Sequence, residues 1–327
     1  MEGLSMNNTL TRARNESRIK PLPIIIVIAA LALLVVLNVV VDGKFLTFQN
    51  FTIILSAATV PAFVAWGFSY LFACGITDLS AGAIIVLAAT ASAIVGNALG
   101  YVPMFIAAVL VGVLCLAVNM TLFQVTKIPP WIAGLGMTMV YETIAGYYSQ
   151  VRVSQGLRVE GLADEMRVLG RSPAIYIMLV IGFIIAYVTY NKTSIGLNAR
   201  AVGGNADASK LNGINVDAYK IKVFIINAVL AGLAGIVLVG RMGTASPAAG
   251  DGYDMDAIAS VVIGGTSVAG GSGSALKTVI GVLMMSVINN SFNLLGVDMY
   301  FQYIFKGLII LVAVGFDSYS KKRLATR

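Results

Sequence analysis

The stretch AIASVVIGGTSVAGGSGSAL, residues 257–276, is long and apolar enough to cross a membrane, yet glycine interrupts its second half. A helix that crosses about 30 Å of hydrocarbon needs roughly 20 mainly apolar residues. This stretch has no charged side chain, but a helix is weakened by its glycines, Gly264, Gly265, Gly270, Gly271 and Gly273. A broken crossing is tolerated only where its freed backbone groups face protein or a water-filled cavity. The stretch therefore predicts an interrupted membrane helix.

The composition of the whole chain also predicts a membrane protein. Of its 327 residues, 58% are hydrophobic and 11% are charged, and the mean hydropathy is +0.88. A soluble domain has about a quarter charged residues, and a soluble globule of this size could not hide so much apolar surface from water. We therefore expect an all-α polytopic membrane protein with about ten transmembrane helices. The predicted spans are residues 21–41, one within 45–77, two within 79–126 separated at 96–103, then 131–148, 172–191, 223–240, 257–276, 278–297 and 299–316.

Charge sets the expected orientation. The 22 Lys and Arg residues outnumber the 15 Asp and Glu residues, but the cations lie between apolar blocks, so we expect contact with membrane lipid and no nucleic-acid partner. Cytoplasmic loops carry the excess of cations, and most of them fall on the cytoplasmic side if the N-terminus does. We expect a basic cytoplasmic tail at 1–20, a transmembrane domain at 21–317 and a basic cytoplasmic tail at 318–327. The largest group of outer cations, which nearby acids dilute, is Arg152, Arg158, Arg167 and Arg171.

The ten predicted spans form two similar halves. Spans two to five and seven to ten are offset by five crossings, an odd number, so one half is inverted relative to the other. Each half contains a Gly/Ser-rich interruption, at residues 75–82 and 264–274. Paired broken helices in inverted halves are typical of a translocation pathway.

Few residues offer chemistry beyond transport. The chain has no histidine, and its two cysteines, Cys74 and Cys115, lie within apolar stretches, so we expect no catalytic or metal site. Neutral polar side chains in the spans suit a sugar or polyol better than an ion, although each could equally form hydrogen bonds between helices. These candidate pathway residues are Ser80, Thr138, Asn289, Asn290, Asn293 and Gln302, whereas Gly264, Gly265, Gly270 and Gly271 are expected only to break the eighth span. Glu142 is predicted either to contact solute or a gate, or to be hydrated near the outer interface.

The longest predicted cytoplasmic connection, residues 192–222, contains a signal for a short helix. Asn205 is a suitable N-cap, Asp207 places negative charge in the first turn, and Gly213 allows a left-handed end. A helix over residues 206–212 would be about 10 Å long. It would give a partner protein a rigid element to push, and the alternative is an ordinary solvated loop.

This loop resembles the coupling loop of permease subunits from bacterial ABC importers of the ribose/monosaccharide type. The resemblance covers about residues 51–316. In the loop it rests on Gly203, Gly204, Asn205, Asp207, Ala208, Ser209 and Gly213, whose pattern is similar to the EAA motif of importer permeases. Elsewhere it rests on residues 75–82, 127–132, 135–136, 252–259, 262–267, 270–271, 290, 293–297, 302 and 306–307. Two departures are Thr77, inserted before Asp78, and Glu142, where many family members have a basic residue.

The resemblance implies a division of labour among several proteins. It implies two permease subunits as a homodimer or heterodimer, two cytoplasmic ATP-binding-cassette ATPase subunits on the coupling loops, and an extracytoplasmic solute-binding protein. ATP and Mg²⁺ would be held by the ATPase subunits, this chain would bind no cofactor, and the location would be the bacterial inner membrane. Permeases for autoinducer-like sugars, nucleosides or branched-chain amino acids would look similar. An ion-coupled secondary transporter is the alternative class, but it needs buried carboxylates at the broken helices, where we identify only Glu142.

Overall fold

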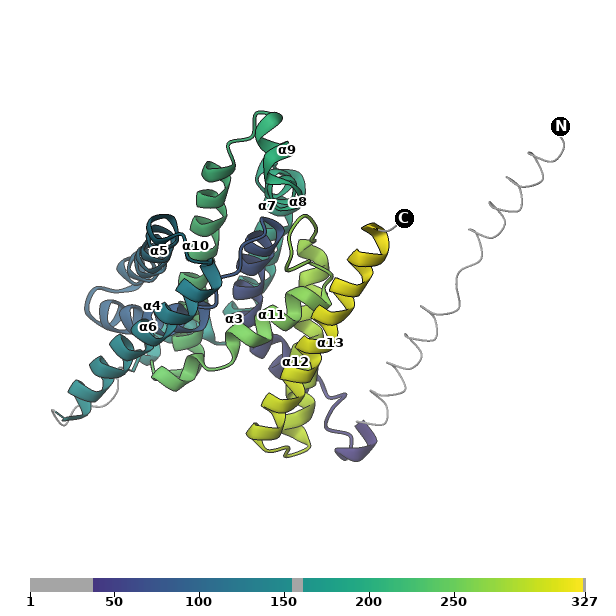
Figure 1. The fold of residues 1–327 in the computed structure, drawn as a ribbon. Helices are drawn as coiled ribbons and strands as arrows, with labels where there is room; N and C mark the ends of the chain where they lie inside the picture. The colour runs from purple at the N-terminus through teal and green to yellow at the C-terminus, as the bar shows by residue number, and fades with distance from the viewer. Residues whose placement is uncertain (1–37, 155–160, 326–327) are drawn as a thin grey trace.

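The computed structural model describes residues 38–154 and 161–325, and this part of the chain is helical with no β-strand (Figure 1). One isolated β-bridge joins Gly161 to Thr244. The helices are α3 (Phe48–Ala73), α4 (Ala81–Leu99), α5 (Tyr101–Thr126), α6 (Pro130–Ser154), the 3-10 helix η1 (Asp164–Gly170), α7 (Ala174–Lys192), α8 (Ser194–Gly204), α9 (Ala206–Leu211), α10 (Val216–Met242), the 3-10 helix η2 (Pro247–Gly250), α11 (Tyr253–Ile263), α12 (Ala275–Leu294) and α13 (Met299–Ala325).

Six of these helices are long and apolar enough to cross a membrane: α3, α4, α5, α7, α10 and α12. They coincide with the second, third, fourth, sixth, seventh and ninth predicted spans. The fifth and tenth predicted spans lie in α6 and α13, and the apolar part of α13 covers Met299–Gly315. The N-terminal tail at 1–20, most of the first predicted span and residues 326–327 lie outside the described residues.

The eighth predicted span is only partly correct. Helix α11 covers Tyr253–Ile263 and ends at Ile263, as the glycines after it predict, so the helical part of this span lies nearer the N-terminus than the predicted range of 257–276. Its 11 residues measure about 16 Å at 1.5 Å each, which is half of the hydrocarbon thickness. Residues 264–274 then turn away instead of continuing the helix, with Gly265, Gly270 and Gly271 at positive φ. The long non-helical approach therefore precedes α11, at residues 243–252.

The interruption predicted in the first half is confirmed. Helix α3 ends at Ala73, and residues 76–80 are non-helical up to the start of α4. Gly75 takes a positive φ of 75°, and its amide donates to the Phe72 carbonyl at 2.8 Å while the Ile76 amide donates to the Leu71 carbonyl at 2.9 Å. These bonds satisfy carbonyls that the helix end would leave free.

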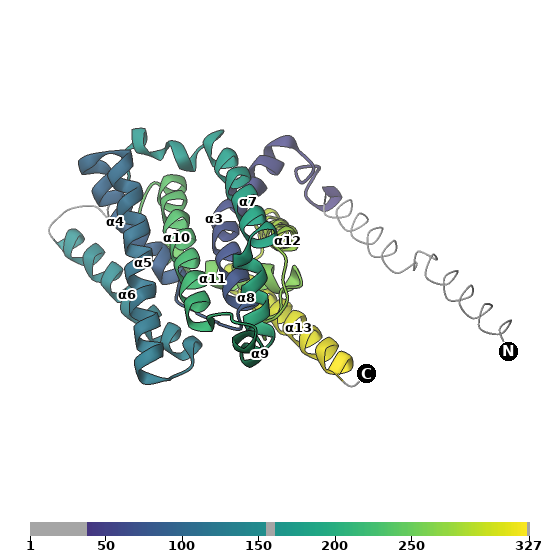
Figure 2. The ribbon, with the colours of Figure 1, turned by 90° about the horizontal axis from the view of Figure 1, so that it is seen from above.

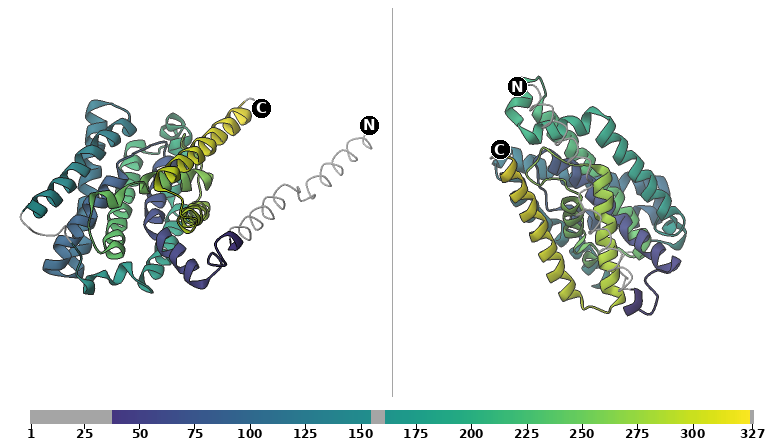
Figure 3. Two further views of the ribbon diagram at one scale, coloured as in Figure 1. Left: turned by 90° about the horizontal axis from the view of Figure 1, so that it is seen from below. Right: turned by 90° about the vertical axis from the view of Figure 1, so that its right-hand side faces the viewer.

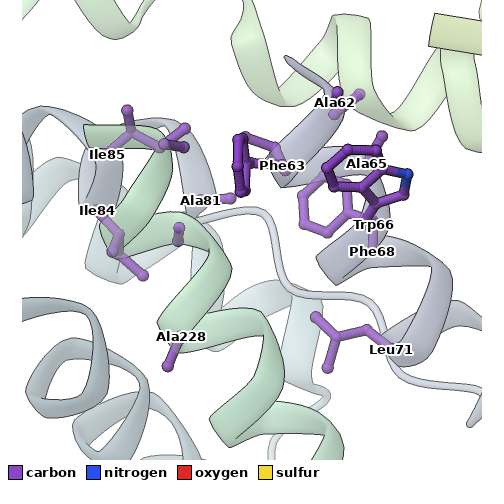
Figure 4. Close-up of a cluster of buried hydrophobic side chains, with 14 of the residues drawn as sticks. Ala62, Phe63, Ala65, Trp66, Phe68, Leu71, Ala81, Ile84, Ile85 and Ala228 are labelled. Atoms are coloured by element: carbon purple, nitrogen blue, oxygen red, sulfur yellow. The ribbon is translucent and has the colours of Figure 1, made fainter. Parts of the chain in front are cut away.

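Helix α10 packs against α3, α4 and α5, and Figure 2 shows it between α5 and α3. The buried core beside it brings together Phe63, Trp66 and Phe68 of α3 with Ile84 and Ile85 of α4 (Figure 4). In the C-terminal half, α11 packs against both α12 and α13, which diverge from the turn at residues 295–298 (Figure 3). The core is thus built from helices that are apolar on nearly all of their faces.

Two glycines allow α5 and α10 to touch through their backbones. A Cβ atom on Gly112 would lie 2.3 Å from the Ala228 carbonyl oxygen, and one on Gly232 would lie 2.6 Å from that of Ala108. In a membrane, where lipid tails are as apolar as leucine, close approach through small residues supplies the packing energy between helices.

We expect Gly112→Ala to lower the free energy of unfolding by about 1–3 kcal/mol, because α5 must move away from α10. Thermal denaturation of the purified protein in detergent measures this loss. Gly136→Ala is the matched control, since a Cβ atom there meets nothing within 4 Å. Equal midpoints for both variants would contradict the prediction.

Candidate functional site

The start of α4, which follows the first interruption, lies beside the start of α11, which follows the second. A Cβ atom on Gly82, in the first turn of α4, would lie 3.3 Å from the Gly250 carbonyl oxygen and 3.6 Å from Cγ of Asp254 in α11. A Cβ atom on Gly250 would lie 2.9 Å from the Gly82 carbonyl oxygen. The first turns of helices carry free N–H groups and partial positive charge. Two such ends therefore lie side by side within the fold.

A buried hydrogen-bond network holds the interruption before α4. The Oδ1 atom of Asp78 accepts from the amide of Ser80 at 2.9 Å and from its hydroxyl at 2.7 Å. Asn119 of α5 donates to Asp78 Oδ2 at 3.0 Å and to the Ser80 hydroxyl at 2.7 Å. The hydroxyl of Thr138 on α6 lies 3.1 Å from the Leu79 carbonyl oxygen. Ser80 and Thr138 thus tie this segment to its neighbours.

A buried ion pair holds the other short helix. Asp256 of α11 lies with its Oδ1 atom 2.9 Å from Nζ of Lys306 on α13, and the two side chains are only 10% and 14% exposed. Asn289 of α12 donates to Asp256 Oδ2 at 2.8 Å. Breaking one side of such a pair costs about 3–5 kcal/mol because a buried charge is left alone. Asp256 therefore fixes α11 to both of its neighbours.

The ion pair lines a cavity of about 530 Å³ between α3, the end of α10, η2, α11, α12 and α13. Four of the predicted pathway residues line the same cavity: Asn289, Asn290, Asn293 and Gln302. Its wall carries two cations and two anions, Arg241, Lys306, Asp251 and Asp256. The cavity is therefore polar, rich in amides and balanced in charge.

Some of these amides also bond to each other. Asn290 and Asn50 of α3 exchange reciprocal bonds of 2.9 and 3.0 Å. Gln302 donates to Asn293 Oδ1 at 3.2 Å and to the Val297 carbonyl at 2.9 Å. The Oδ1 atom of Asn289 is buried and has no hydrogen-bond partner among the described residues. Asn290 therefore joins helices, whereas Asn289 keeps one buried acceptor without a partner there.

The remaining predicted pathway residue lies elsewhere. Glu142 is exposed on α6 and is within electrostatic range of Asp251 and Asp254. It does not line the 530 Å³ cavity. Glu142 therefore lies near two acids, one just before α11 and one in its first turn.

Two buried carboxylates were not identified as pathway residues from the sequence. Asp78 is 2% exposed and Asp256 is 7% exposed, and each lies beside the interruption in its half of the chain. The expectation that Glu142 is the only acid near the broken helices is therefore wrong. Asp78 and Asp256 each lie in or beside a predicted interrupted segment, but their partners Asn119 and Lys306 lie 41 and 50 residues away. No local pattern links residues so distant.

The short helix predicted between residues 192 and 222 is confirmed as α9. The side chain of Asn205 accepts from the Ala208 amide at 2.9 Å, and the hydroxyl of Ser209 donates to the Asn205 carbonyl at 2.8 Å. Gly213 has a φ of +79° just after the helix. Asp207 and Ala208 are exposed, and Leu211 is 90% exposed. The helix is a rigid, exposed projection at one end of the bundle (Figure 1).

The glycines predicted to break the eighth span all lie in the turn after α11. Gly264 packs on the Lys277 carbonyl of α12, where a Cβ atom would lie 2.6 Å from the oxygen. Gly265 has open space around it. Gly270 and Gly271 contact Gly203 and Gly204 at the end of α8, which brings two predicted groups of glycines together.

Residues 50–314 match the family of branched-chain amino acid transport system / permease component proteins. The chain is 37% identical over 298 residues to the ribose import permease protein of Escherichia coli strain K12, covering 88% of this chain and 92% of that protein. It is 32% identical over 318 residues to the galactose/methyl galactoside import permease protein of Haemophilus influenzae, covering 89% and 94%. It is 35% identical over 277 residues to the D-allose transport system permease protein of Escherichia coli strain K12, covering 84% of each chain. No solved structure is significantly similar to it.

The match covers both interrupted segments, the cavity and the α8–α9 projection. The chain therefore belongs to the family of branched-chain amino acid transport system permease components, and it is a transport protein rather than an enzyme.

Proposed function

We propose that this chain is the membrane subunit of an ATP-binding-cassette importer that moves a monosaccharide across the bacterial inner membrane. The observation that carries the proposal is the identity of 32 to 37% to ribose and galactose import permeases over almost the whole chain. The cavity supports it, because amide groups and balanced charges suit an uncharged polyol. The partners are an ATPase pair, a solute-binding protein and a second permease subunit, identical or different.

The proposed topology has ten crossings in two inverted halves. The order of elements supports this arrangement: α3, a non-helical segment, α4, α5 and α6 in one half correspond to α10, a non-helical segment, α11, α12 and α13 in the other. The contact between Gly82 and Gly250 places the corresponding interruptions next to each other. A pathway between rigid halves would pass close to this contact.

The proposed orientation has both termini in the cytoplasm. The cations of η1, which would lie outside, already have local partners. Asp164 lies 2.6 Å from Arg171 and 3.1 Å from Arg167, and Arg167 also donates to the carbonyl of Gly240 near the end of α10. The Arg171 hydrogen bond lowers the pKa of Asp164, so this carboxylate stays ionised to a lower pH than an unpaired aspartate does. These two outer arginines are a minority of the 22 Lys and Arg residues, most of which lie on the cytoplasmic side in the proposed orientation.

In the proposed mechanism this chain forms the pathway for the solute, and the ATPase subunits supply the energy. The ATPase subunits bind ATP and Mg²⁺, and the movement of these subunits pushes on α9. The halves of the permease then rock, and solute released by the binding protein passes along the neutral polar residues. Asn289, which lines the cavity, and the ion pair beside it are the candidate contacts for solute hydroxyls.

One alternative solute within the family is supported by a specific observation. The family description names branched-chain amino acids, so an amino acid is a second candidate solute. Reconstitution in proteoliposomes with candidate ATPase subunits and binding proteins separates the two, using labelled monosaccharides and labelled leucine with and without ATP. Uptake driven by a proton or sodium gradient without ATPase subunits would instead reveal a secondary transporter.

We expect Gly213→Pro to abolish uptake and leave membrane insertion intact. Proline fixes φ near −65°, whereas Gly213 needs a φ of +79°, so the end of α9 must change. A bulky residue at the exposed Ala208 should have the same effect by obstructing docking. Uptake and ATPase activity of the reconstituted complex are the measurements, and normal transport by both variants would exclude α9 as the coupling element.

We expect Lys306→Met to lower the stability by about 3–5 kcal/mol, because Asp256 is left as an unpaired buried charge. The double variant Asp256→Asn with Lys306→Met should regain most of the thermal midpoint, since it buries no charge. If the pair also contacts solute, uptake stays low in the double variant. A thermal midpoint of Lys306→Met equal to that of the parent protein would contradict the stabilising role of the pair.

A further inference from the structure

The turn between α11 and α12 touches the end of α8 through backbone atoms alone. A Cβ atom on Gly270 would lie 2.5 Å from the Gly203 carbonyl oxygen, and one on Gly271 would lie 3.0 Å from Cα of Gly204. Side chains of ordinary size cannot occupy this contact. We propose that this double-glycine contact transmits movement of α9 to the short helix α11, an inference that rests on the proposed ATPase coupling.

The end of α3 completes the contact. A Cβ atom on Gly203 would lie 2.0 Å from the Ala73 carbonyl oxygen, and the same oxygen accepts a hydrogen bond of 3.0 Å from the Gly271 amide. Three segments that are far apart in the chain are therefore joined at one carbonyl group. Backbone atoms in close contact have no rotamers to absorb a displacement, so movement of one segment moves the others.

On the cytoplasmic side the contact connects directly to α9. Gly204 is the last residue of α8, and the next residue, Asn205, caps α9. The Asn205 amide donates to the Ala201 carbonyl at 3.1 Å, so the junction between α8 and α9 has helical bonding on both sides. A push on α9 therefore reaches Gly203 and Gly204 through one capped residue.

On the membrane side the contact connects directly to α11. The Thr266 amide donates to the Val261 carbonyl at 3.1 Å, and the Gly265 amide donates to the Val262 carbonyl at 2.8 Å. The Gly270 amide donates to the Ser267 carbonyl at 3.1 Å, which keeps the turn folded on itself. Because α11 carries Asp256, a displacement of the turn reaches the ion pair and the polar cavity.

A buried tyrosine sets the orientation of the contact. Tyr190 of α7 is fully buried, and the Arg200 guanidinium of α8 lies 5.1 Å from its ring centroid. A Cβ atom on Gly273 would lie 2.3 Å from the Tyr190 hydroxyl oxygen. The turn therefore meets α7 as well as α8, so it cannot swing about the double-glycine contact alone.

The test compares Gly203→Ala with Gly112→Ala. Both glycines lie in helices, and both replacements would clash with a backbone oxygen, at 2.0 Å for Gly203 and 2.3 Å for Gly112, but Gly112 is at the α5–α10 interface. The complex with the ATPase subunits is purified and reconstituted. We measure the thermal midpoint, co-purification of the ATPase subunits, ATP hydrolysis and uptake of labelled ribose.

We expect both variants to lose similar stability and to retain the ATPase subunits. In Gly203→Ala, the amount of ribose imported per ATP hydrolysed should fall at least tenfold, whereas in Gly112→Ala this ratio should be unchanged. An unchanged ratio in Gly203→Ala, or an equal fall in both variants, overturns the proposal. If the unmodified chain does not retain ATPase subunits at all, the proposed function itself fails.

A graded series at Gly204 tests the proposal even if Gly203→Ala does not fold. Gly204 is exposed, and a Cβ atom there would lie 3.7 Å from Cα of Gly271, an ordinary contact distance. Alanine, valine and leucine at Gly204 should therefore lower the ratio of import to hydrolysis progressively, with a constant thermal midpoint. A ratio that is independent of side-chain size would overturn the proposal.

Discussion

Every backbone polar group of this fold that lies at membrane depth must find a partner inside the protein, because hydrocarbon offers none. The continuous helices meet this requirement by themselves, but residues 75–80 and 243–252 do not. Asp78 and Ser80 supply bonds to the first of these segments, and Asn119 and Thr138 join it to α5 and α6. Non-helical chain is thus possible here only because other helices surround it.

The same requirement explains why small residues gather where helices cross. Glycine at positions 112 and 232 brings the α5 and α10 backbones together, and glycine at positions 203 and 270 does so at the proposed coupling contact. In both places the absent side chain gives a direct contact between main chains. The first contact packs two antiparallel helices along their length, whereas the second joins the end of α8 to the turn after α11.

Much of the fold can be predicted from the long stretches without charged residues and from the positions of the glycines. The six long helices, the interruption after Gly75 and the capped helix that starts after Asn205 are all local in origin, so the sequence predicts them well. The place of the second interruption is not local. Glycine marks where α11 stops, but only its contacts with α8 show that residues 264–274 turn back instead of crossing.

The sequence predicts which polar residues line the candidate site, but it does not predict which residues they bond to. Asn289, Asn290, Asn293 and Gln302 are spaced along two successive helices and do line one cavity. Asn50, Asn119 and Lys306 gain their roles from residues 41 to 240 positions away, which a single sequence does not connect.

The balance of charge in the cavity wall has an electrical consequence. Arg241 and Lys306 offset Asp251 and Asp256, so the wall has no net charge. An uncharged solute that crosses it carries no current, and its passage does no work against the membrane voltage, which costs about 2.3 kcal/mol per elementary charge at 100 mV. In the proposed ATP-driven importer, accumulation of such a solute would be limited by the phosphorylation potential of the cell and would be insensitive to depolarisation.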